Sequence, residues 1–521
     1  MKLLEKSTFL LLTLFLVACS SESTVVETNL SDFEITILST TSNSIELKWS
    51  ESFHSKGENV FYSVYLDSNL LKEKTQERRI ILTDLNSNNE YKLKIVAFDE
   101  EENFKEITEK ISTLSNQAPR SFKIENANPE NISVALYWQR ATDPDNDQVK
   151  YNVFINDAIV FQNLETTYCK IENLTPNTSY EVKVVAFDSL GNETYDELTF
   201  STKDGVFKDS IEFNTQASLD AFGSKGYIEV DGSLIITDGT SPSDRITDLT
   251  AIKSLKKIRG NFIVRLTRDL LTLKGIEIEE VRGNLIVENN HFFESIEGLE
   301  KVKHIYGDLI IKENVRLKTF IPFDNLTQIG RILTIANNGV KTIEAFKNLE
   351  VVNHIYIRNN WYLESLIGFH KLKKMDESLR INDNTELSYI EGFTNLESVN
   401  NLTLSDIKAN ELFNMTKLKV VKGSLSISNL PNIKNLIGFS ALEEIRYSDL
   451  SIGGNKSLES LEGLNNLKSI GNRFSVSNNE KLNDFCALKL ALQSYDENYY
   501  TIRGNMFNPT MEEILNNDCK N

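Results

Sequence analysis

Apolar residues recur in one short pattern from about Asp209 to Cys519. The pattern is Gly-x-Leu-x-Ile-x-x-Asn, and it is clearest at 283–290 and 307–314. Most copies are 22 to 25 residues apart, a spacing typical of the stacked rungs of a solenoid. The first apolar residue of the pattern recurs at twelve positions: Leu234, Phe262, Leu285, Leu309, Leu333, Ile355, Leu379, Leu402, Leu425, Leu450, Phe474 and Tyr500.

Each copy predicts a short strand followed by bends. In Leu-x-Ile the apolar residues alternate with variable ones, as in a strand with one buried face. Five glycines before Leu or Phe suit bends with positive φ: Gly298, Gly368, Gly392, Gly438 and Gly463. The asparagines that close the strands are expected to stack as a ladder, where their amides pair with backbone groups; they are Asn290, Asn314, Asn338, Asn360, Asn384, Asn455, Asn479 and Asn505. The ladder residue is missing at Gly239, Thr267, Ile407 and Leu430.

A different unit is duplicated nearer the N-terminus. Trp49 and Trp138 are 89 residues apart (138 − 49), and so are Tyr91 and Tyr180 (180 − 91). The alternating segments 91–99 and 180–188 match nearly position for position. We therefore expect two copies of one β domain.

These motifs resemble two known families. A Trp on an early strand, followed by Leu-x₅-Tyr before a late strand, resembles the fibronectin type III sandwich, whose Tyr hydroxyl bonds back to the backbone. The Asn-ending repeat resembles the receptor L domain, and most closely the version found in bacterial surface lipoproteins. This resemblance implies a right-handed, leucine-rich β-solenoid of about twelve rungs. The sequence lacks the cysteine-rich modules that accompany receptor L domains in animals, so receptor signalling is not implied.

The predicted fold class is therefore mainly β, with two Ig-like (fibronectin type III) sandwiches followed by an L-domain-like solenoid. The expected boundaries are 1–19 for a signal segment, 20–29 for a tether, 30–114 and 117–203 for the sandwiches, 204–230 for an N-terminal cap and 231–521 for the solenoid.

The first nineteen residues predict export. Lys2 and Lys6 precede an apolar stretch, 9–17, that is too short to span a bilayer. The segment Leu-Val-Ala-Cys at 16–19 resembles the bacterial lipobox, which implies lipidation of Cys19; an ordinary signal peptide with a chance Cys is the alternative. Because Ser20 is not the Asp that resembles an inner-membrane retention signal, we expect an outer-membrane, surface-exposed lipoprotein held by its lipid anchor.

The remaining cysteines predict how the solenoid ends. The segment 505–510 resembles the terminal cap of bacterial relatives, in which Cys486 and Cys519 would form a disulfide that stabilises the cap by about 3–4 kcal/mol. A metal site is the alternative, although no His is close to either Cys in the sequence. Cys169 then has no partner and is predicted to be a buried, small apolar residue.

Charge limits the partners. The net charge of −19 argues against nucleic acid, whose phosphates require Lys and Arg. Asp143, Asp145 and Asp147 alternate along one loop and could ligate a structural Ca²⁺, although a polar loop held by turn hydrogen bonds is the preferred interpretation. No other cofactor is expected.

The outward positions of the solenoid strands carry the candidate binding residues. Ile235, Ile263, Ile286 and Ile310 predict an apolar stripe, which is either covered by 209–230 or the second sandwich, the preferred interpretation, or is a partner interface. Tyr356, Arg358, Trp361 and Tyr362 suit sugar stacking or a protein hot spot, with core packing at a bend as an equal alternative, above all for Trp361.

The sequence contains no His-Glu-x-x-His, no Gly-x-Ser-x-Gly and no phosphate-binding glycine loop. We therefore predict a non-catalytic surface lipoprotein whose solenoid recognises a protein or polysaccharide, in adhesion or nutrient capture. The alternatives are a scaffold component of an outer-membrane complex and a non-cleaving accessory subunit of a glycan-utilisation system.

Overall fold

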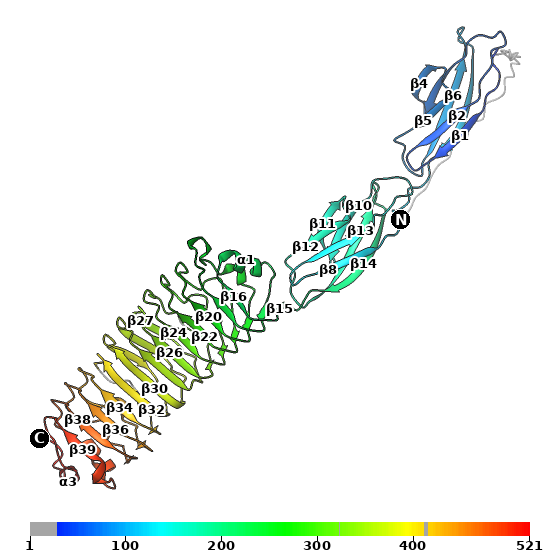
Figure 1. Ribbon diagram of the computed structural model, residues 1–521. Coiled ribbons are helices and arrows are strands. Elements are labelled where there is room, and N and C mark those ends of the chain that lie inside the picture. Colours follow the sequence, from blue (N-terminus) through cyan, green and yellow to red (C-terminus); the bar gives the residue numbers. More distant parts are fainter. Residues whose placement is uncertain (1–28, 322, 411–414) are drawn as a thin grey trace, which may run out of the picture. The chain divides into compact units, whose positions relative to one another are not determined.

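The computed structural model describes residues 29–321, 323–410 and 415–521, and Figure 1 shows that strands dominate them. The predicted signal segment, Cys19 and all but the last residue of the predicted tether lie outside these residues. Among the helices of the described ranges, none combines the length and the apolar character that crossing a bilayer requires.

Residues 30–114 form two antiparallel sheets, with strand orders β1-β2-β5 and β4-β3-β6-β7. The strands are β1 (Ile35–Thr40), β2 (Ile45–Trp49), β3 (Phe61–Leu66), β4 (Asn69–Thr75), β5 (Arg79–Leu82), β6 (Glu90–Phe98) and β7 (Phe104–Ser112). Trp49 and Tyr62 pack edge to face in the core, with ring centroids 5.6 Å apart. The Tyr91 hydroxyl accepts a hydrogen bond from the Asn86 N–H at 2.6 Å, so the predicted tyrosine corner is confirmed.

Residues 117–203 repeat this arrangement strand for strand, with orders β12-β9-β8 and β11-β10-β13-β14. The strands are β8 (Ile124–Pro129), β9 (Val134–Trp138), β10 (Lys150–Ile155), β11 (Ala158–Leu164), β12 (Tyr168–Ile171), β13 (Ser179–Phe187) and β14 (Glu193–Ser201). The Tyr180 hydroxyl accepts from the Thr175 N–H at 2.9 Å, a second tyrosine corner. Cys169 is buried without a disulfide, as predicted, and burial raises the pKa of its thiol to about 12.

The rest of the chain winds as a β-solenoid of about twelve rungs, where one rung is one circuit of the chain with one strand in a long parallel sheet. In Figure 1 these strands stack in chain order from green to red. They are β16 (Ile211–Phe213), β18 (Leu234–Ile236), β20 (Phe262–Arg265), β22 (Leu285–Glu288), β24 (Leu309–Lys312), β26 (Ile332–Ala336), β28 (His354–Arg358), β30 (Lys374–Asn384), β32 (Ser398–Ile407), β34 (Leu425–Ser428), β36 (Leu450–Gly453), β38 (Phe474–Ser477) and β39 (Tyr500–Arg503). The two apolar residues of each pattern point inward; Leu285 and Val287, for example, are fully buried.

Shorter parallel strands line the other sides of the solenoid. They are β15 (Val206–Phe207), β17 (Glu229–Val230), β19 (Lys257–Ile258), β21 (Glu280–Val281), β23 (His304–Ile305), β25 (Gln328–Ile329), β27 (Thr342–Ala345), β29 (Ser365–Gly368), β31 (Tyr389–Gly392), β33 (Val420–Val421), β35 (Glu444–Ile445) and β37 (Ser469–Ile470). Single 3₁₀ turns join some strands: η1 (Pro242–Asp244), η2 (Thr250–Ile252), η3 (Ile437–Phe439) and η5 (Glu497–Tyr499). One continuous apolar core runs through all rungs, because a single rung cannot bury its own inner face.

The predicted asparagine ladder is confirmed, and it satisfies its own buried amides. The Asn314 Oδ1 accepts from the Asn290 backbone N–H at 3.2 Å, and its Nδ2 donates to the Val287 carbonyl at 2.9 Å. The next asparagine, Asn338, repeats both bonds one rung further on. The residue directly before a ladder asparagine has a left-handed backbone conformation; Asn337, before Asn338, has a φ of 55°.

Rungs without a ladder asparagine compensate in different ways. Thr267 donates both its N–H and its hydroxyl to Asn290 Oδ1, and the Leu430 N–H donates to Asn455 Oδ1. At Ile407 no side-chain amide exists, and the backbone pairing itself extends, so that Asn384 opposes Ile407 at the ends of β30 and β32. Backbone hydrogen bonds there replace the amide bonds of the ladder.

A second polar ladder, which we did not predict, precedes the strands. The side-chain oxygens of Asn261, Asn284 and Asp308 each accept the backbone N–H of the same position on the following rung, at 2.8 to 3.1 Å. The long sheet is therefore held at both ends of its strands by side chains that pair with the next rung.

The glycine prediction was partly wrong. Gly298, Gly368 and Gly463 have positive φ, but Gly392 and Gly438 do not. The stronger requirement is close approach between rungs, since a Cβ on Gly368 would lie 1.9 Å from the Ala345 carbonyl oxygen and one on Gly392 would lie 2.4 Å from the Gly368 oxygen. The positive φ falls instead on buried phenylalanines, such as Phe393.

Both ends of the solenoid are capped, as predicted. At the first end, α1 (Gln216–Gly223) buries Leu219 and Phe222 in the core, and Thr215 caps it by accepting the Ser218 N–H at 3.1 Å. An exposed core end is thereby avoided.

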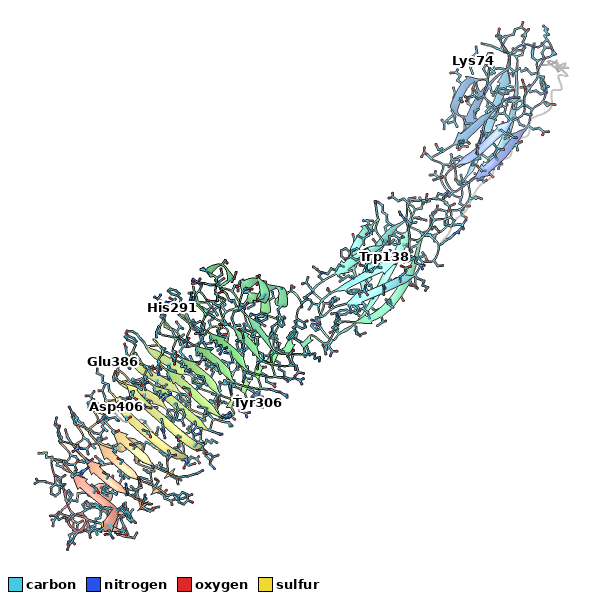
Figure 2. The ribbon with its side chains drawn as sticks, in the orientation of Figure 1. Lys74, Trp138, His291, Tyr306, Glu386 and Asp406 are labelled. Atoms are coloured by element: carbon cyan, nitrogen blue, oxygen red, sulfur yellow. A yellow bond between two sulfur atoms is a disulfide. The ribbon has the colours of Figure 1, made fainter. Side chains whose placement is uncertain are left out.

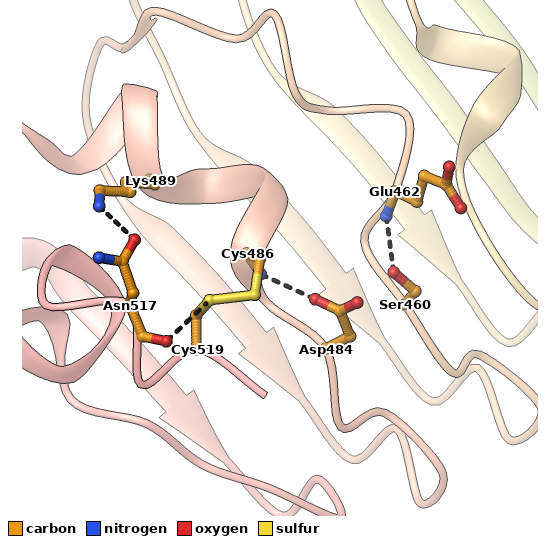
Figure 3. The surroundings of a disulfide bond; sticks show 7 residues. All are labelled: Ser460, Glu462, Asp484, Cys486, Lys489, Asn517 and Cys519. Atoms are coloured by element: carbon orange, nitrogen blue, oxygen red, sulfur yellow. Dashed lines mark hydrogen bonds between the residues drawn. A yellow bond between two sulfur atoms is a disulfide. The ribbon is translucent and has the colours of Figure 1, made fainter. Parts of the chain in front are cut away.

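At the last end, η4 (Cys486–Leu488) leads into α2 (Lys489–Leu492), and α3 (Met511–Leu515) follows the final strand. The Cys486–Cys519 disulfide is confirmed (Figure 3). The Asp484 carboxylate beside it accepts the Cys486 N–H at 3.0 Å, so a side-chain bond fixes the start of the 3₁₀ turn.

Candidate ligand-recognition face

The outward residues in the middle of the long-sheet strands form one column in register. From the first strand to the last they are Glu212, Ile235, Ile263, Ile286, Ile310, Thr334, Tyr356, Arg380, Thr403, Ser426, Ser451, Ser475 and Thr501. The column changes from apolar to polar after Ile310. A single sheet face therefore presents two chemically different surfaces.

The four isoleucines are half-buried, because neighbouring strands of a parallel sheet shield each other's outward side chains. The preferred prediction that 209–230 covers them was wrong for that segment. Its strand β16 joins the sheet edge in the same plane, and α1 packs at the end of the core against η2. The apolar stripe is thus part of the sheet surface, and the charged Glu212 borders it on the first strand.

An aromatic and basic group follows the apolar part of the column. The Tyr356 hydroxyl lies 3.0 Å from His354 Nδ1, which also accepts the Ser378 N–H at 3.4 Å. The Arg380 guanidinium on the next strand lies 5.9 Å from the centre of the Tyr356 ring. These contacts fix the tyrosine ring on the sheet surface.

Trp361 and Tyr362 are each 60% exposed, so the alternative that Trp361 packs in the core is wrong. They follow the ladder residue Asn360 on the rung of Tyr356, and Arg358 on the same rung is also exposed. The four predicted ligand residues therefore all belong to β28 and the turn that follows it. Tyr356 and Arg358 lie on the sheet face, and Trp361 and Tyr362 lie on its rim.

We call the turns that begin directly after the ladder positions the turn edge; their first residues are Thr240, Arg268, His291, Val315, Gly339, Trp361, Thr385, Lys408, Pro431, Lys456, Glu480 and Met506. In Figure 2, His291 lies on this edge, with Glu386 further along it, and Tyr306 lies on the opposite side of the solenoid. Val315 is 63% exposed. The residue at the same position on the next rung is Gly339, where a Cβ would lie 2.2 Å from the Val315 carbonyl oxygen.

The turn edge also contains a hollow of about 630 Å³ that we did not predict. Its lining includes Leu266, which is 54% exposed, together with Arg268, His291 and Phe292. The Arg316 guanidinium lies 4.2 Å from the Phe292 ring centre. Gly239 and Thr267, two of the positions without a ladder asparagine, line the same hollow. The loss of the asparagine at two successive ladder positions was the feature of the sequence that coincides with this hollow.

The three loop aspartates of the second sandwich do not gather into a metal centre, and no group of three His, Cys, Asp or Glu side chains in the described ranges does so. The Asp143 Oδ1 accepts the Asp145 N–H at 2.8 Å, Asp145 Oδ2 accepts the Gln117 N–H at 2.8 Å, and Asp147 Oδ2 lies 3.1 Å from the Ser189 hydroxyl. The first of these hydrogen bonds closes a turn within the loop, and the other two join the loop to neighbouring segments, as expected of a polar loop.

A comparison with known protein families identifies the second of the two sandwiches. The family model "Fibronectin type III domain" matches residues 117–202. The second sandwich is a fibronectin type III domain. The first sandwich has the same strand order in both of its sheets.

Among solved structures, a two-domain fibronectin type III segment from chicken tenascin is 18% identical, covering 33% of this chain and 99% of that one, with a TM-score of 0.19. The fibronectin(III)-like modules of Clostridium thermocellum CbhA are 17% identical, covering 33% of this chain and 95% of the other, with a TM-score of 0.17.

Two proteins of the yeast Saccharomyces cerevisiae are similar over a longer stretch. Sporulation-specific protein 2 is 23% identical over 323 residues, which cover 51% of this chain and 61% of the relative. Sporulation-specific protein 22 is 24% identical over 325 residues, which cover 58% of this chain and 64% of the relative. The match spans less than two thirds of the length of either relative.

Proposed function

We propose that the solenoid is a receptor L-domain-like recognition module that binds a polysaccharide or a protein through its turn edge and the adjacent sheet face. The observation that carries this proposal is the pair of adjacent aromatic side chains, Trp361 and Tyr362, each 60% exposed on the rung of Tyr356 and Arg358. Adjacent exposed aromatic side chains form an apolar patch, and such patches mark contact sites.

The surroundings favour a carbohydrate as the first ligand class to test. Flat aromatic rings stack on the apolar faces of sugars, and the neighbouring Arg358, Tyr356 and Arg380 supply hydrogen bonds to hydroxyl groups. The hollow at His291 and Phe292 lies on the same edge and offers a second aromatic wall with basic neighbours. Several weak subsites along one edge suit a linear chain better than a single small molecule.

The chain from Ser20 to Asn521, which lacks the lipidated cysteine, should therefore bind saturably to members of a polysaccharide and glycan array. Replacing Trp361 and Tyr362 together by Ala is expected to weaken binding about 30-fold or more, the size of a typical aromatic hot spot. Tyr447→Ala is the matched control, because Tyr447 is 72% exposed and lies outside the turn edge, and it should bind as the wild type does.

A blank array on folded protein would argue against carbohydrate and favour a protein partner. The half-buried column of Ile235, Ile263, Ile286 and Ile310 supports this second candidate, in which the solenoid docks on a scaffold or a glycan-utilisation complex. Crosslinking the full chain in its own membrane would then identify the partner.

We also propose that the chain is a lipoprotein of the outer membrane, displayed at the cell surface through Cys19. Cells grown with radiolabelled palmitate should label the protein, and Cys19→Ala should abolish the label. A Cys19→Ala protein that is labelled as strongly as the wild type would contradict the anchor.

A further inference from the structure

The two sandwiches place different chemistry at the same site. Adding 89 to the number of a residue in the first gives its counterpart in the second, so His54 corresponds to Asp143, Glu58 to Asp147 and Asp99 to Asp188. Lys56 corresponds in the same way to Asp145. Two bases and two acids in the first copy are therefore replaced by four aspartates in the second.

In the first sandwich the acids surround a buried imidazole. The His54 side chain is 1% exposed, and its Nε2 lies 3.5 Å from Asp99 Oδ2 and 3.9 Å from Glu58 Oε2. Its Nδ1 accepts the Glu58 backbone N–H at 3.3 Å. The basic ring thus provides a partner for carboxylates that would otherwise face each other, one of which, Asp99, is fully buried.

In the second sandwich Asp143 occupies the position of that ring. Its Oδ1 accepts the Asp147 backbone N–H at 3.3 Å, the same bond that His54 accepts from Glu58. The loop is therefore held in the same way, but a negative group stands where the first copy has a base. Asp99 has the His54 Nε2 at 3.5 Å, whereas the residue at the equivalent position beside Asp188 is another carboxylate.

Two oxygens at this site are buried and unpaired. Within the described ranges, Asp143 Oδ2 and Asn116 Oδ1 have no hydrogen-bond partner although each exposes less than 1 Å². The same Asn116 donates its Nδ2 to Asp188 Oδ2 at 2.5 Å, which brings the amide to the acidic group. A buried carboxylate oxygen without a partner is destabilising, so an arrangement that pairs it is favoured.

The carboxylates also act on one another. Burial, followed by the charges of Asp143, Asp188 and Asp145, raises the pKa of Asp147 against the opposing hydrogen bond from Ser189. The carboxylates of Asp143, Asp188 and Asp145 are therefore close enough to disfavour the ionisation of Asp147.

We propose that a calcium ion takes the place of the His54 imidazole in the second sandwich, bound by Asp143 Oδ2, Asn116 Oδ1 and the carboxylates of Asp147 and Asp188. Calcium accepts six to eight oxygen ligands in flexible geometry, and carboxylate and amide oxygens are those it prefers. No three His, Cys, Asp or Glu side chains of the described ranges already form a metal centre, so binding includes a movement of these carboxylates toward the ion. Asn116 belongs to the joint before the second sandwich, so binding also fastens that joint.

The chain from Ser20 to Asn521 should take up Ca²⁺ in a calorimetric titration with a dissociation constant of about 10⁻⁴–10⁻³ M, as extracellular calcium modules do. At a saturating 10 mM CaCl₂, scanning calorimetry should show the melting transition of the second sandwich about 5 °C or more above its value in EDTA.

The first sandwich supplies the decisive variant, Asp143→His. It restores the base found at the equivalent position, so the protein should fold in EDTA, and the calcium-dependent shift should disappear. Asp157→Asn, which changes an exposed aspartate in the β10–β11 turn, is the matched control and should keep the full shift.

Absence of binding by the wild type would overturn the proposal. So would an unchanged calcium response in Asp143→His, because the ion would then bind elsewhere on this acidic chain. If Asp143→His fails to fold, Asp147→Asn gives the same readout, and its unchanged response would likewise overturn the site. An equal shift with Mg²⁺ at 10 mM would overturn the assignment to calcium, since Mg²⁺ demands six ligands at 2.0–2.1 Å in octahedral geometry.

Discussion

At the scale of single residues, the buried asparagines explain how neighbouring rungs stay stacked although most of the strands that join them are short. Each ladder amide closes a turn of its own rung and pairs with the backbone of the preceding one, as Asn360 does with the Asn338 N–H and the Ile335 carbonyl. A buried amide is favourable only when all its groups are paired, and the repetition of the rung guarantees the pairing. This explains why the residue type recurs so regularly in the sequence.

Replacing Asn360 by Ala should destabilise the solenoid by about 2–5 kcal/mol, because it leaves the Asn338 N–H and the Ile335 carbonyl buried and unpaired. The measurement is the guanidinium midpoint of the solenoid transition. Asn348→Ala is the control, since that amide makes one surface bond to the Asp324 carbonyl, and it should cost about 1 kcal/mol or less. Equal midpoints for the two variants would contradict the role of the ladder.

At the scale of elements, four phenylalanines form a stack inside the solenoid that holds successive bends in register. Phe323, Phe346, Phe369 and Phe393 are fully buried, with neighbouring ring centroids 5.1, 5.2 and 4.8 Å apart and planes within 19° of parallel. The stacked rings bury a large area and fill the space between successive rungs.

Phe369→Ala should therefore cost about 3–5 kcal/mol of solenoid stability, because it opens a cavity between two stacked rings. Phe369→Leu keeps most of the volume and should cost less than about 1.5 kcal/mol. Chemical unfolding of both variants gives the comparison. A loss in Phe369→Leu as large as in Phe369→Ala would mean that ring geometry, rather than filled volume, sets the stability of the bend.

At the scale of the whole molecule, the solenoid is a modular unit in which each rung contacts its neighbours. The rung from Leu425 to Asp449 has 25 residues (449 − 425 + 1), and it separates two strands with the same inward pattern, β32 and β36. Deleting it would place Leu402 and Leu404 beside Leu450 and Ile452. The Ile407 N–H could then donate to Asn455, as Leu430 now does.

A chain without residues 425–449 should thus fold, with a calorimetric enthalpy of solenoid unfolding lower by about 17 kcal/mol, the share of 25 residues. Removing only 425–436 breaks the period and should prevent cooperative unfolding, which scanning calorimetry would detect. Cooperative folding of the half-rung deletion, or failure of the whole-rung deletion, would contradict nearest-neighbour stacking.

Periodic features were predictable from the sequence because each depends on one residue type at one repeated position. The solenoid strands, the asparagine ladder and both tyrosine corners belong to this class, whereas the Cys486–Cys519 pair was predicted from the resemblance of the terminal cap. The physical reason is that the alternation of apolar residues and the hydrogen bonds of the tyrosine and asparagine side chains depend on the same residue positions in every copy. Each copy of the pattern is therefore subject to the same constraint.

Only the tertiary structure decided what depends on neighbouring rungs or on the other copy of a domain. The exposure of Trp361, the hollow beside Phe292 and the in-plane position of β16 depend on which side chains lie one rung away. The need for glycine at Gly392 depends on a carbonyl 24 residues earlier, at Gly368 (392 − 368). Sequence alone fixes the residue at each position, but packing between distant segments decides which surfaces stay open to a ligand.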